Sequence, residues 1–196
     1  MPNQMRANRI GSTKERALYE AKGLLQRYGF NGFSFQHIAD LLGIKKPSLY
    51  DHFKSKDDLG QLLVRDYDQA FKDWSLTVES FESKQKIESF FEIFYRFASQ
   101  SSRICPMSAF IGDFHSLSGP IKKALSKLYQ KQFDWVDQVI QDGQKKRLFR
   151  RDQSSEDLAS VVVSMAIGSQ FSARILGSAH YIREMKIQAI QFLEKA

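Results

Sequence analysis

The stretch KKPSLYDHFKSK, residues 45–56, concentrates side chains that attract anions and donate hydrogen bonds. Four lysines surround two hydroxyl groups and an imidazole there: Lys45, Lys46, Lys54, Lys56, Ser48, Tyr50 and His52. Lysine ammonium groups neutralise phosphates, whereas hydroxyl and imidazole groups can also reach the edges of bases. This combination indicates a surface that contacts nucleic acid.

A break between two short helices positions these side chains. Ser34 is a candidate N-cap for a helix that carries Ile38, Ala39, Leu41 and Leu42 and ends at Gly43. Glycine adopts the left-handed conformation without a side-chain penalty, so the chain can turn sharply at Gly43. Pro47 suits the first turn of the next helix, which we expect over residues 46–52. Two short helices joined in this way form a helix-turn-helix.

The charge of the chain favours an acidic partner. Its 196 residues carry 29 Lys and Arg against 22 Asp and Glu, a net charge of +7. The first 60 residues hold 10 of these cations and 6 of these anions, net +4, and the remaining residues hold 19 and 16, net +3. Positive charge is therefore denser around the predicted helix-turn-helix, as expected for a nucleic-acid-binding domain.

Apolar residues recur with helical spacing along the rest of the chain, which predicts an all-α fold. Ser12 and Glu15 form a capping box at the start of a helix that Gly29 ends. A longer helix is expected from Ser55, followed by a join near residues 77–86. The later helices are expected near residues 87–97, 109–115, 121–143, 155–176 and 181–194, with a basic connector, QKKRLFRRDQSS, before the last two.

The stretch GFSFQHIADLLGIKKPSLYDHFKSKDDL, residues 32–59, resembles the N-terminal signature of the TetR family of dimeric, ligand-responsive bacterial transcriptional regulators. The resemblance covers about residues 12–60, whereas the remainder is similar only in length and helical organisation. It implies an N-terminal arm and three-helix helix-turn-helix DNA-binding domain over residues 1–55. A larger helical ligand-binding and dimerisation domain would then occupy residues 56–196.

The resemblance also assigns DNA contacts by position. The predicted DNA-binding residues are Ser34, Gln36, His37, Lys45, Lys46, Pro47, Ser48, Tyr50, His52 and Lys56. Lys45 stands where the family usually has a small capping residue, so we expect it to contact a phosphate instead. For two of these residues the sequence leaves an alternative to DNA contact. Tyr50 would then only cover the core, and Lys56 would belong to an ordinary solvated face. Arg6 and Arg9 either enter a DNA groove or form part of a disordered tail.

By the same resemblance, the C-terminal domain dimerises through its last two helices and binds a small effector. Predicted homodimer contacts are Ala166, Gly168, Ala173, Met185 and Ala189, unless these residues are simply buried inside one chain. The candidate residues for an apolar or aromatic effector are Phe90, Phe94, Phe97, Cys105, Phe110, Phe114, Trp135 and Phe171. On the fourth helix, Tyr67, Phe71 and Trp74 would link the effector pocket to the DNA-binding domain.

Cys105 is the single cysteine, so neither an intrachain disulfide nor paired-cysteine zinc spacing is possible. It is either a reactive thiol at a helix start beside Arg103 or an ordinary buried cysteine. The N-terminus lacks the apolar core of a signal peptide, and the apolar stretch LASVVVSMAIGSQF falls short of a membrane span. We therefore expect a cytoplasmic protein with no membrane partner.

Two other classes compete with a ligand-responsive repressor that binds a near-palindromic operator on double-stranded DNA. The first is a DNA-binding protein without an effector, such as a constitutive repressor. The second is a helical metal-dependent enzyme, for which only Asp113 and His115 offer ligands at close spacing. The chain has no metal-binding helix motif, phosphate-binding loop or nucleophile elbow. The sequence thus predicts a non-enzymatic regulator with no metal and no cofactor.

Overall fold

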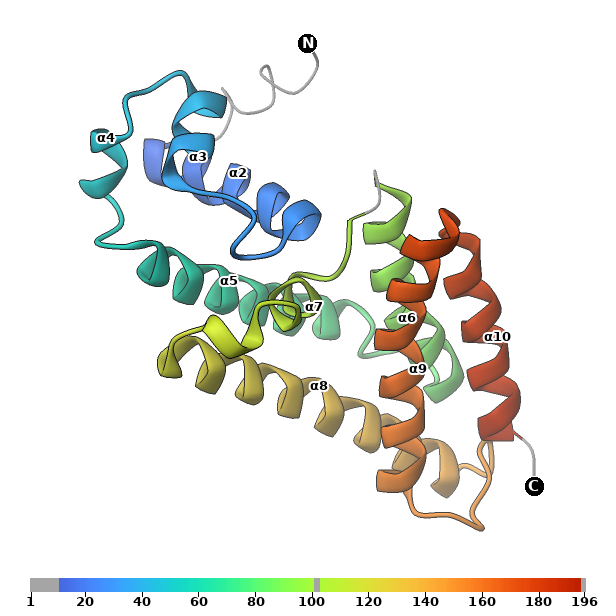
Figure 1. The fold of residues 1–196 in the computed structure, drawn as a ribbon. Helices are drawn as coiled ribbons and strands as arrows, with labels where there is room; N and C mark the ends of the chain where they lie inside the picture. Colours follow the sequence, from blue (N-terminus) through green and yellow to red (C-terminus); the bar gives the residue numbers. More distant parts are fainter. Residues whose placement is uncertain (1–10, 101–102, 195–196) are drawn as a thin grey trace. The chain divides into compact units, whose positions relative to one another are not determined.

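The computed structural model describes residues 11–100 and 103–194, and Figure 1 shows how they are folded. Arg6 and Arg9 lie outside these residues. The described chain forms nine α-helices and one 3-10 helix and contains no strand, which confirms the all-α prediction. The helices are α2 (Thr13–Tyr28), α3 (Phe35–Leu42), α4 (Pro47–Tyr50), α5 (Lys56–Thr77), α6 (Ser83–Ser99), α7 (Pro106–Ile111), η1 (Phe114–Ser116), α8 (Gly119–Lys145), α9 (Ser155–Leu176) and α10 (His180–Glu194).

The described chain divides into two compact units. The first contains residues up to 68 together with 106–125, and the second contains the described residues of 69–105 and 126–196. Helices α5 and α8 therefore contribute to both units. The sequence-based boundary between residues 55 and 56 stays a prediction. The structure adds that residues 106–125, from the larger predicted domain, belong to the same unit as the N-terminal helices.

Local hydrogen bonds begin α2 as the sequence predicts. The Ser12 N–H donates to Glu15 Oε2 at 2.8 Å, and the Glu15 N–H donates to Ser12 Oγ at 3.4 Å. These two bonds confirm the capping box. The helix ends when the Gly29 N–H bonds the Leu25 carbonyl at 2.9 Å. Its buried face, which includes Ala21 and Leu25, packs in the core of the first unit.

The turn between α3 and α4 depends on Gly43, which has φ 65° and ψ 34°. The Ile44 N–H reaches back to the Ala39 carbonyl at 3.1 Å and closes the end of α3. The following helix, α4, is shorter than the predicted 46–52. The His52 and Phe53 N–H groups both donate to the Leu49 carbonyl, at 3.1 and 2.9 Å, in the turn that follows it. Pro47 occupies the first turn of α4, as predicted.

Helices α6, α9 and α10 pack against one another in the second unit (Figure 1). An aromatic cluster forms the core beside them, between α5, α6 and α8. The Trp74 and Trp135 ring centroids lie 5.0 Å apart, and the Phe90 centroid lies 5.9 Å from that of Trp135. Phe94 and Phe71 extend the cluster, at 5.0 Å from Phe90 and 6.1 Å from Trp135. The aromatic residues after residue 70 therefore supply much of this core.

Helices α7 and α8 also differ from the prediction at their boundaries, and α6 begins at Ser83, inside the predicted join. Helix α8 continues to Lys145, so Gly143 does not end it. A Cβ built on Gly143 would lie 2.1 Å from Cδ2 of Phe149, which shows that the glycine makes room for that ring. The short helix predicted over 109–115 begins instead at Pro106 and ends at Ile111, and η1 follows it. Proline is favoured in a first turn because its missing N–H would lack an intrahelical partner there.

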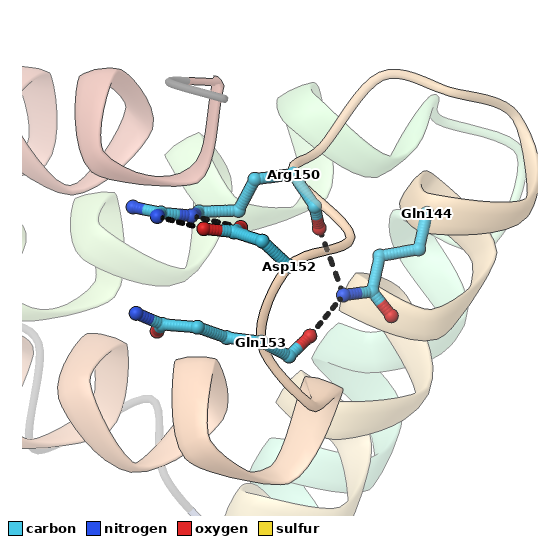
Figure 2. A network of polar contacts seen from close by, with 4 residues as sticks. All are labelled: Gln144, Arg150, Asp152 and Gln153. Atoms are coloured by element: carbon cyan, nitrogen blue, oxygen red, sulfur yellow. Dashed lines mark hydrogen bonds and ion pairs between the residues drawn. The ribbon is translucent and has the colours of Figure 1, made fainter.

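The basic connector between α8 and α9 is a well-defined turn, shown in Figure 2. Gln144 Nε2 donates to the carbonyls of Arg150, at 2.8 Å, and Gln153, at 3.0 Å. Arg150 Nε donates to Asp152 Oδ1 at 2.7 Å, and this bond holds the pKa of Asp152 below its ordinary value. The Arg150 N–H also donates to the Leu193 carbonyl at 2.7 Å. The connector is thereby tied to the end of α10.

Helix α9 is the one described helix that is long and apolar enough to cross a membrane, by length and composition alone. The expectation that this stretch falls short of a span is wrong by that criterion, because the helix extends beyond the stretch at both ends, to 22 residues. Helix α9 nevertheless packs against α6 and α10. A core helix of a globular protein passes the same test of length and composition, so α9 alone does not indicate a membrane protein.

The close approach of α5 and α8 at Gly60 gives a test of the first unit. A Cβ at Gly60 would lie 2.7 Å from Ile121 Cδ1 and 2.8 Å from the Phe30 ring. Gly60→Ala gains up to about 1 kcal/mol in helix propensity, but overpacking costs about 1–3 kcal/mol. We therefore expect urea denaturation to show a lower free energy of unfolding. Gly119→Ala is the control, since nothing lies within 4 Å of its Cβ position. Equal stability of Gly60→Ala and wild type would contradict this packing.

Candidate nucleic-acid interface

The turn before α4 and the outer side of α4 form an exposed, cationic tip. Lys45, Lys46 and Pro47 are exposed, and Tyr50 is 52% exposed, whereas Leu49 is buried beneath them. The Tyr50 ring also packs edge-to-face on Phe35, with centroids 5.1 Å apart. Tyr50 therefore covers the core and still presents about half of its surface. This contact restricts the ring and leaves its hydroxyl available to a partner, so the two sequence-based alternatives for Tyr50 are compatible.

The start of α3 carries further polar side chains of the predicted DNA-binding set. The Ser34 N–H donates to His37 Nδ1 at 3.1 Å. Because Nδ1 accepts this bond, the neutral imidazole carries its proton on Nε2, where it can serve as a donor. Gln36 is exposed and its Nε2 donates to Asp40 Oδ1 at 2.7 Å. Ser48 and His52 are half-buried. Contact of these residues with DNA stays a prediction.

Lys56 is half-buried, and its ammonium group contacts the loop between α2 and α3. Its Nζ donates to the Phe33 carbonyl and lies 4.8 and 4.7 Å from the ring centroids of Phe30 and Phe33. Burial lowers the pKa of Lys56, and the nearby Asp113 carboxylate opposes this shift. A phosphate contact by Lys56 stays a prediction, and it would require the ammonium group to leave the carbonyl and both rings. The alternative of an ordinary solvated lysine conflicts with this geometry.

Sequence reasoning missed the side chains that join residues 106–125 to the loop after α2. Asp113 Oδ2 accepts the Asn31 N–H at 3.0 Å, and Asn31 Nδ2 donates to Ser116 Oγ at 2.8 Å. The same Asp113 carboxylate would lie 2.9 Å from a Cβ on Gly29. These partners are more than 80 residues apart in the chain, so no local pattern in the sequence indicates the contact.

The predicted effector residues fall into several places. Phe90, Phe94 and Trp135 meet in the aromatic cluster of the second unit, and Phe97 is half-buried on α6. Phe171 is exposed on α9. In the first unit, Phe110 packs on Phe30 at 5.2 Å, and Phe114 is exposed with Lys122 Nζ 5.5 Å from its centroid. That these residues line one effector pocket stays a prediction.

Cys105 is buried and its N–H donates to Gln170 Oε1 at 2.7 Å. It directly precedes α7, so the predicted place at a helix start is confirmed. Its burial agrees with the alternative of an ordinary buried cysteine rather than with an accessible thiol.

The predicted dimer residues divide by burial. Ala166, Ala173 and Ala189 are buried inside the single chain, so for them the alternative of internal packing holds. The physical reason is that small side chains let α9 approach α6 and α10 closely. Gly168 is exposed and Met185 is half-buried. Only these two of the five predicted residues remain accessible to another subunit.

Two family models match the chain. One described as "Bacterial regulatory proteins, tetR family" matches residues 17–61, the helices that form the cationic tip. Another described as "Tetracyclin repressor-like, C-terminal domain" matches residues 83–189, more than half of the chain. The chain belongs to the TetR family. It is therefore a TetR-family transcriptional regulator with an N-terminal helix-turn-helix. Membership of this non-enzymatic family, rather than the absence of catalytic motifs, distinguishes it from an enzyme.

Comparisons with individual proteins agree with this assignment. The curated HTH-type transcriptional repressor DhaR from Mycobacterium sp. (strain GP1) is 22% identical over 151 residues, which cover 75% of each chain. A solved TetR transcriptional regulator from Legionella pneumophila has a TM-score of 0.85 at 28% identity and covers 94% of this chain and 98% of that one. A TetR-family regulator from Agrobacterium tumefaciens shares the fold, with a TM-score of 0.86 at 20% identity over 98% and 99% of the two chains.

Asp113 and His115 belong to no larger cluster of metal-ligating side chains in the described part of the chain. Within residues 11–100 and 103–194, no group of three His, Cys, Asp or Glu side chains is placed to hold a metal ion. The Asp113 carboxylate accepts a backbone hydrogen bond instead.

Tyr50→Ala is expected to weaken binding to a specific operator by about 1–3 kcal/mol and binding to random DNA by much less. The reason is that α4 is the expected recognition helix, the one that enters the major groove. A tyrosine on it would contact base edges, whereas non-specific binding depends on phosphates. Fluorescence anisotropy on both DNAs measures the difference. Tyr28→Ala, an exposed tyrosine on α2, is the control. An equal loss on both DNAs would argue against base readout by Tyr50.

Lys46→Ala and Lys56→Ala are expected to act differently. Lys46→Ala should lower affinity for all DNA sequences and reduce the slope of log affinity against log salt by about one unit, because one phosphate contact is lost. Lys56→Ala should leave the slope unchanged and lower the free energy of unfolding by about 1–2 kcal/mol, because a charged hydrogen bond and two cation–π contacts are lost. A reduced slope of log affinity against log salt for a stably folded Lys56→Ala would support the predicted phosphate contact of Lys56.

Proposed function

We propose that this TetR-family regulator is a cytoplasmic repressor that binds a near-palindromic operator as a homodimer and responds to a small apolar or aromatic molecule. The observation that carries the proposal is the exposed tip formed by Lys45, Lys46 and Tyr50 on a rigid turn. A helix of this kind enters the major groove, and a dimer presents two of them about one turn of DNA apart. The name of DhaR as a repressor supports repression.

The exposed face of α9 supports dimerisation. The exposed residues at helical spacing there are Val161, Ser164, Gly168, Phe171 and Ile175. Ile175 is 85% exposed, and Ile187 on α10 adds another exposed apolar side chain. Contiguous apolar surface of this kind favours a partner helix over solvent, and the glycine and serine let that helix approach closely. We propose that this face, rather than the buried alanines, forms the homodimer contact.

The aromatic cluster supports an apolar or aromatic effector. Phe71, Trp74, Phe90 and Trp135 come from three helices, so a molecule inserted among their rings would separate these helices. Side chains of this type line most pockets for small organic molecules. The effector can act as a switch only if it binds one arrangement of the helices more tightly than the other.

Two continuous segments of the chain lead from the second unit to the DNA-binding helices and support coupling to the effector. Helix α5 carries Lys56, bonded to the Phe33 carbonyl, at its first residue and Trp74 near its end. Residues 106–125 follow Cys105 directly and are bonded to Asn31 through Asp113. A shift of either segment would act on the loop between α2 and α3. We propose that the effector changes operator affinity through these two segments.

Ile175→Arg tests the proposal. We expect sedimentation to show a dimer for wild type and a monomer for this variant, because an arginine would be buried without a partner at the contact. Affinity for an operator obtained by in vitro selection should fall at least tenfold, since each half-site is then bound alone. Ile111→Arg, which changes an exposed isoleucine on α7, should remain a dimer. A monomeric wild type that binds no selected DNA would refute the proposal.

A further inference from the structure

Helix α8 buries the amide of Gln132 in the middle of its apolar face. The aliphatic residues of this face recur at helical spacing and are all buried: Ile121, Leu125, Leu128, Val136 and Val139. Gln132 lies between Leu128 and Val136 in the same series and is only 1% exposed. A polar side chain therefore occupies a position at which the spacing of the helix predicts an aliphatic one.

The carbonyl oxygen of this amide lacks a partner. Gln132 Oε1 is buried and accepts no hydrogen bond from any residue that the structure describes. A buried oxygen that loses its water and gains no donor destabilises the folded chain, and such atoms are nearly always bonded to protein, water or a ligand. We therefore expect a donor at this oxygen that the described residues do not supply.

Gln132 is a close neighbour of the aromatic cluster. Trp135 follows it by three residues on α8, and side chains at this spacing lie side by side on a helix, with Cβ atoms about 5–6 Å apart. The centroid of the Trp135 ring lies 5.0 Å from that of Trp74, 5.9 Å from that of Phe90 and 6.1 Å from that of Phe71. All five residues belong to the second unit. The amide thus adds a hydrogen-bonding group beside a mostly apolar set of rings.

We propose that Gln132 selects effectors that carry a hydroxyl group on an aromatic ring, the chemical class of the phenols. The ring of the effector would lie among the rings of the cluster, and its hydroxyl would donate to Gln132 Oε1. A hydroxyl both donates and accepts, so it also suits the reversed amide, in which Nε2 takes the place of Oε1. Neither Gln132 nor the four rings carries a formal charge, which favours a neutral hydroxyl over a phenolate.

This inference rests on the proposed function, because it takes the aromatic cluster as the effector site, and it adds the chemical class of the effector. Rings alone would accept an aromatic hydrocarbon as readily as a phenol. A site with an unbonded acceptor discriminates between them, since the hydrocarbon leaves that acceptor unsatisfied and the phenol bonds it. Functional sites commonly keep groups that lower stability, and the Gln132 amide is such a group.

Binding of 4-ethylphenol and of ethylbenzene, which differ by one hydroxyl group, tests the role of Gln132. Both tryptophans of the chain, Trp74 and Trp135, belong to the cluster, so their fluorescence reports ligand entry directly. The ratio of the two dissociation constants, hydrocarbon over phenol, should fall at least about fivefold in Gln132→Met, because the hydroxyl loses its acceptor. Comparing ratios cancels the difference in hydration between the probes. Gln130→Met, the same change at an exposed residue of α8, should keep the wild-type ratio.

The same titrations distinguish failure of this inference from failure of the proposed function. If wild type and Gln132→Met bind both probes with the same ratio, the role of Gln132 is refuted and the aromatic effector site remains. If wild type binds neither probe up to the limit of its solubility, the effector site and this inference are both refuted.

Thermal unfolding without ligand gives a second measurement. Gln132→Met and Gln132→Leu both replace the unbonded amide by an apolar side chain, so we expect a higher Tm for at least one of them and little change for Gln130→Met. Gln132→Leu also serves in the titrations if Gln132→Met does not fold. A lower Tm for both Gln132 variants would mean that the amide is bonded within the fold, and would overturn the inference.

Discussion

One half-buried ammonium group connects two elements of the DNA-binding part of this molecule. Lys56 Nζ is bonded to the Phe33 carbonyl and lies against the rings of Phe30 and Phe33, so the first residue of α5 is attached to the loop between α2 and α3. Helix α4 is covalently held between α3 and α5. Because both of its neighbours are tied in this way, the short recognition helix has little freedom even though its own four residues could not form a stable helix alone.

Residues 106–125 belong to the first unit, where α7 packs against α2, and Asp113 of this segment lies near Lys56. Desolvation disfavours the charged form of Lys56 and lowers its pKa, and the Asp113 carboxylate offsets part of this penalty. Asp113 also accepts the Asn31 N–H, which anchors the segment before α8 to the same loop. A segment that the chain order assigns to the larger domain thus stabilises the fold of the DNA-binding helices. Coupling between the two parts of a TetR-family regulator needs such a physical connection.

Charge and apolar surface serve different purposes in the two units. The tip of the first unit exposes lysines and a tyrosine, which suits a highly charged partner such as DNA. The exposed face of α9 instead combines apolar side chains with a glycine and a serine, which suits packing against another helix.

The sequence by itself determined the helices, the sharp turn at Gly43 and the types of residue at the tip. These features depend on interactions within a few residues: the capping box of Ser12 and Glu15, the left-handed glycine, and the 3.6-residue spacing of apolar side chains. Tertiary structure alone decided that Lys56 bonds the Phe33 carbonyl, that Gly143 admits Phe149, and that three of the predicted interface alanines are buried in one chain. Each of these outcomes depends on a neighbour brought close by folding, and the face of a helix that a residue occupies does not tell which surface will cover it.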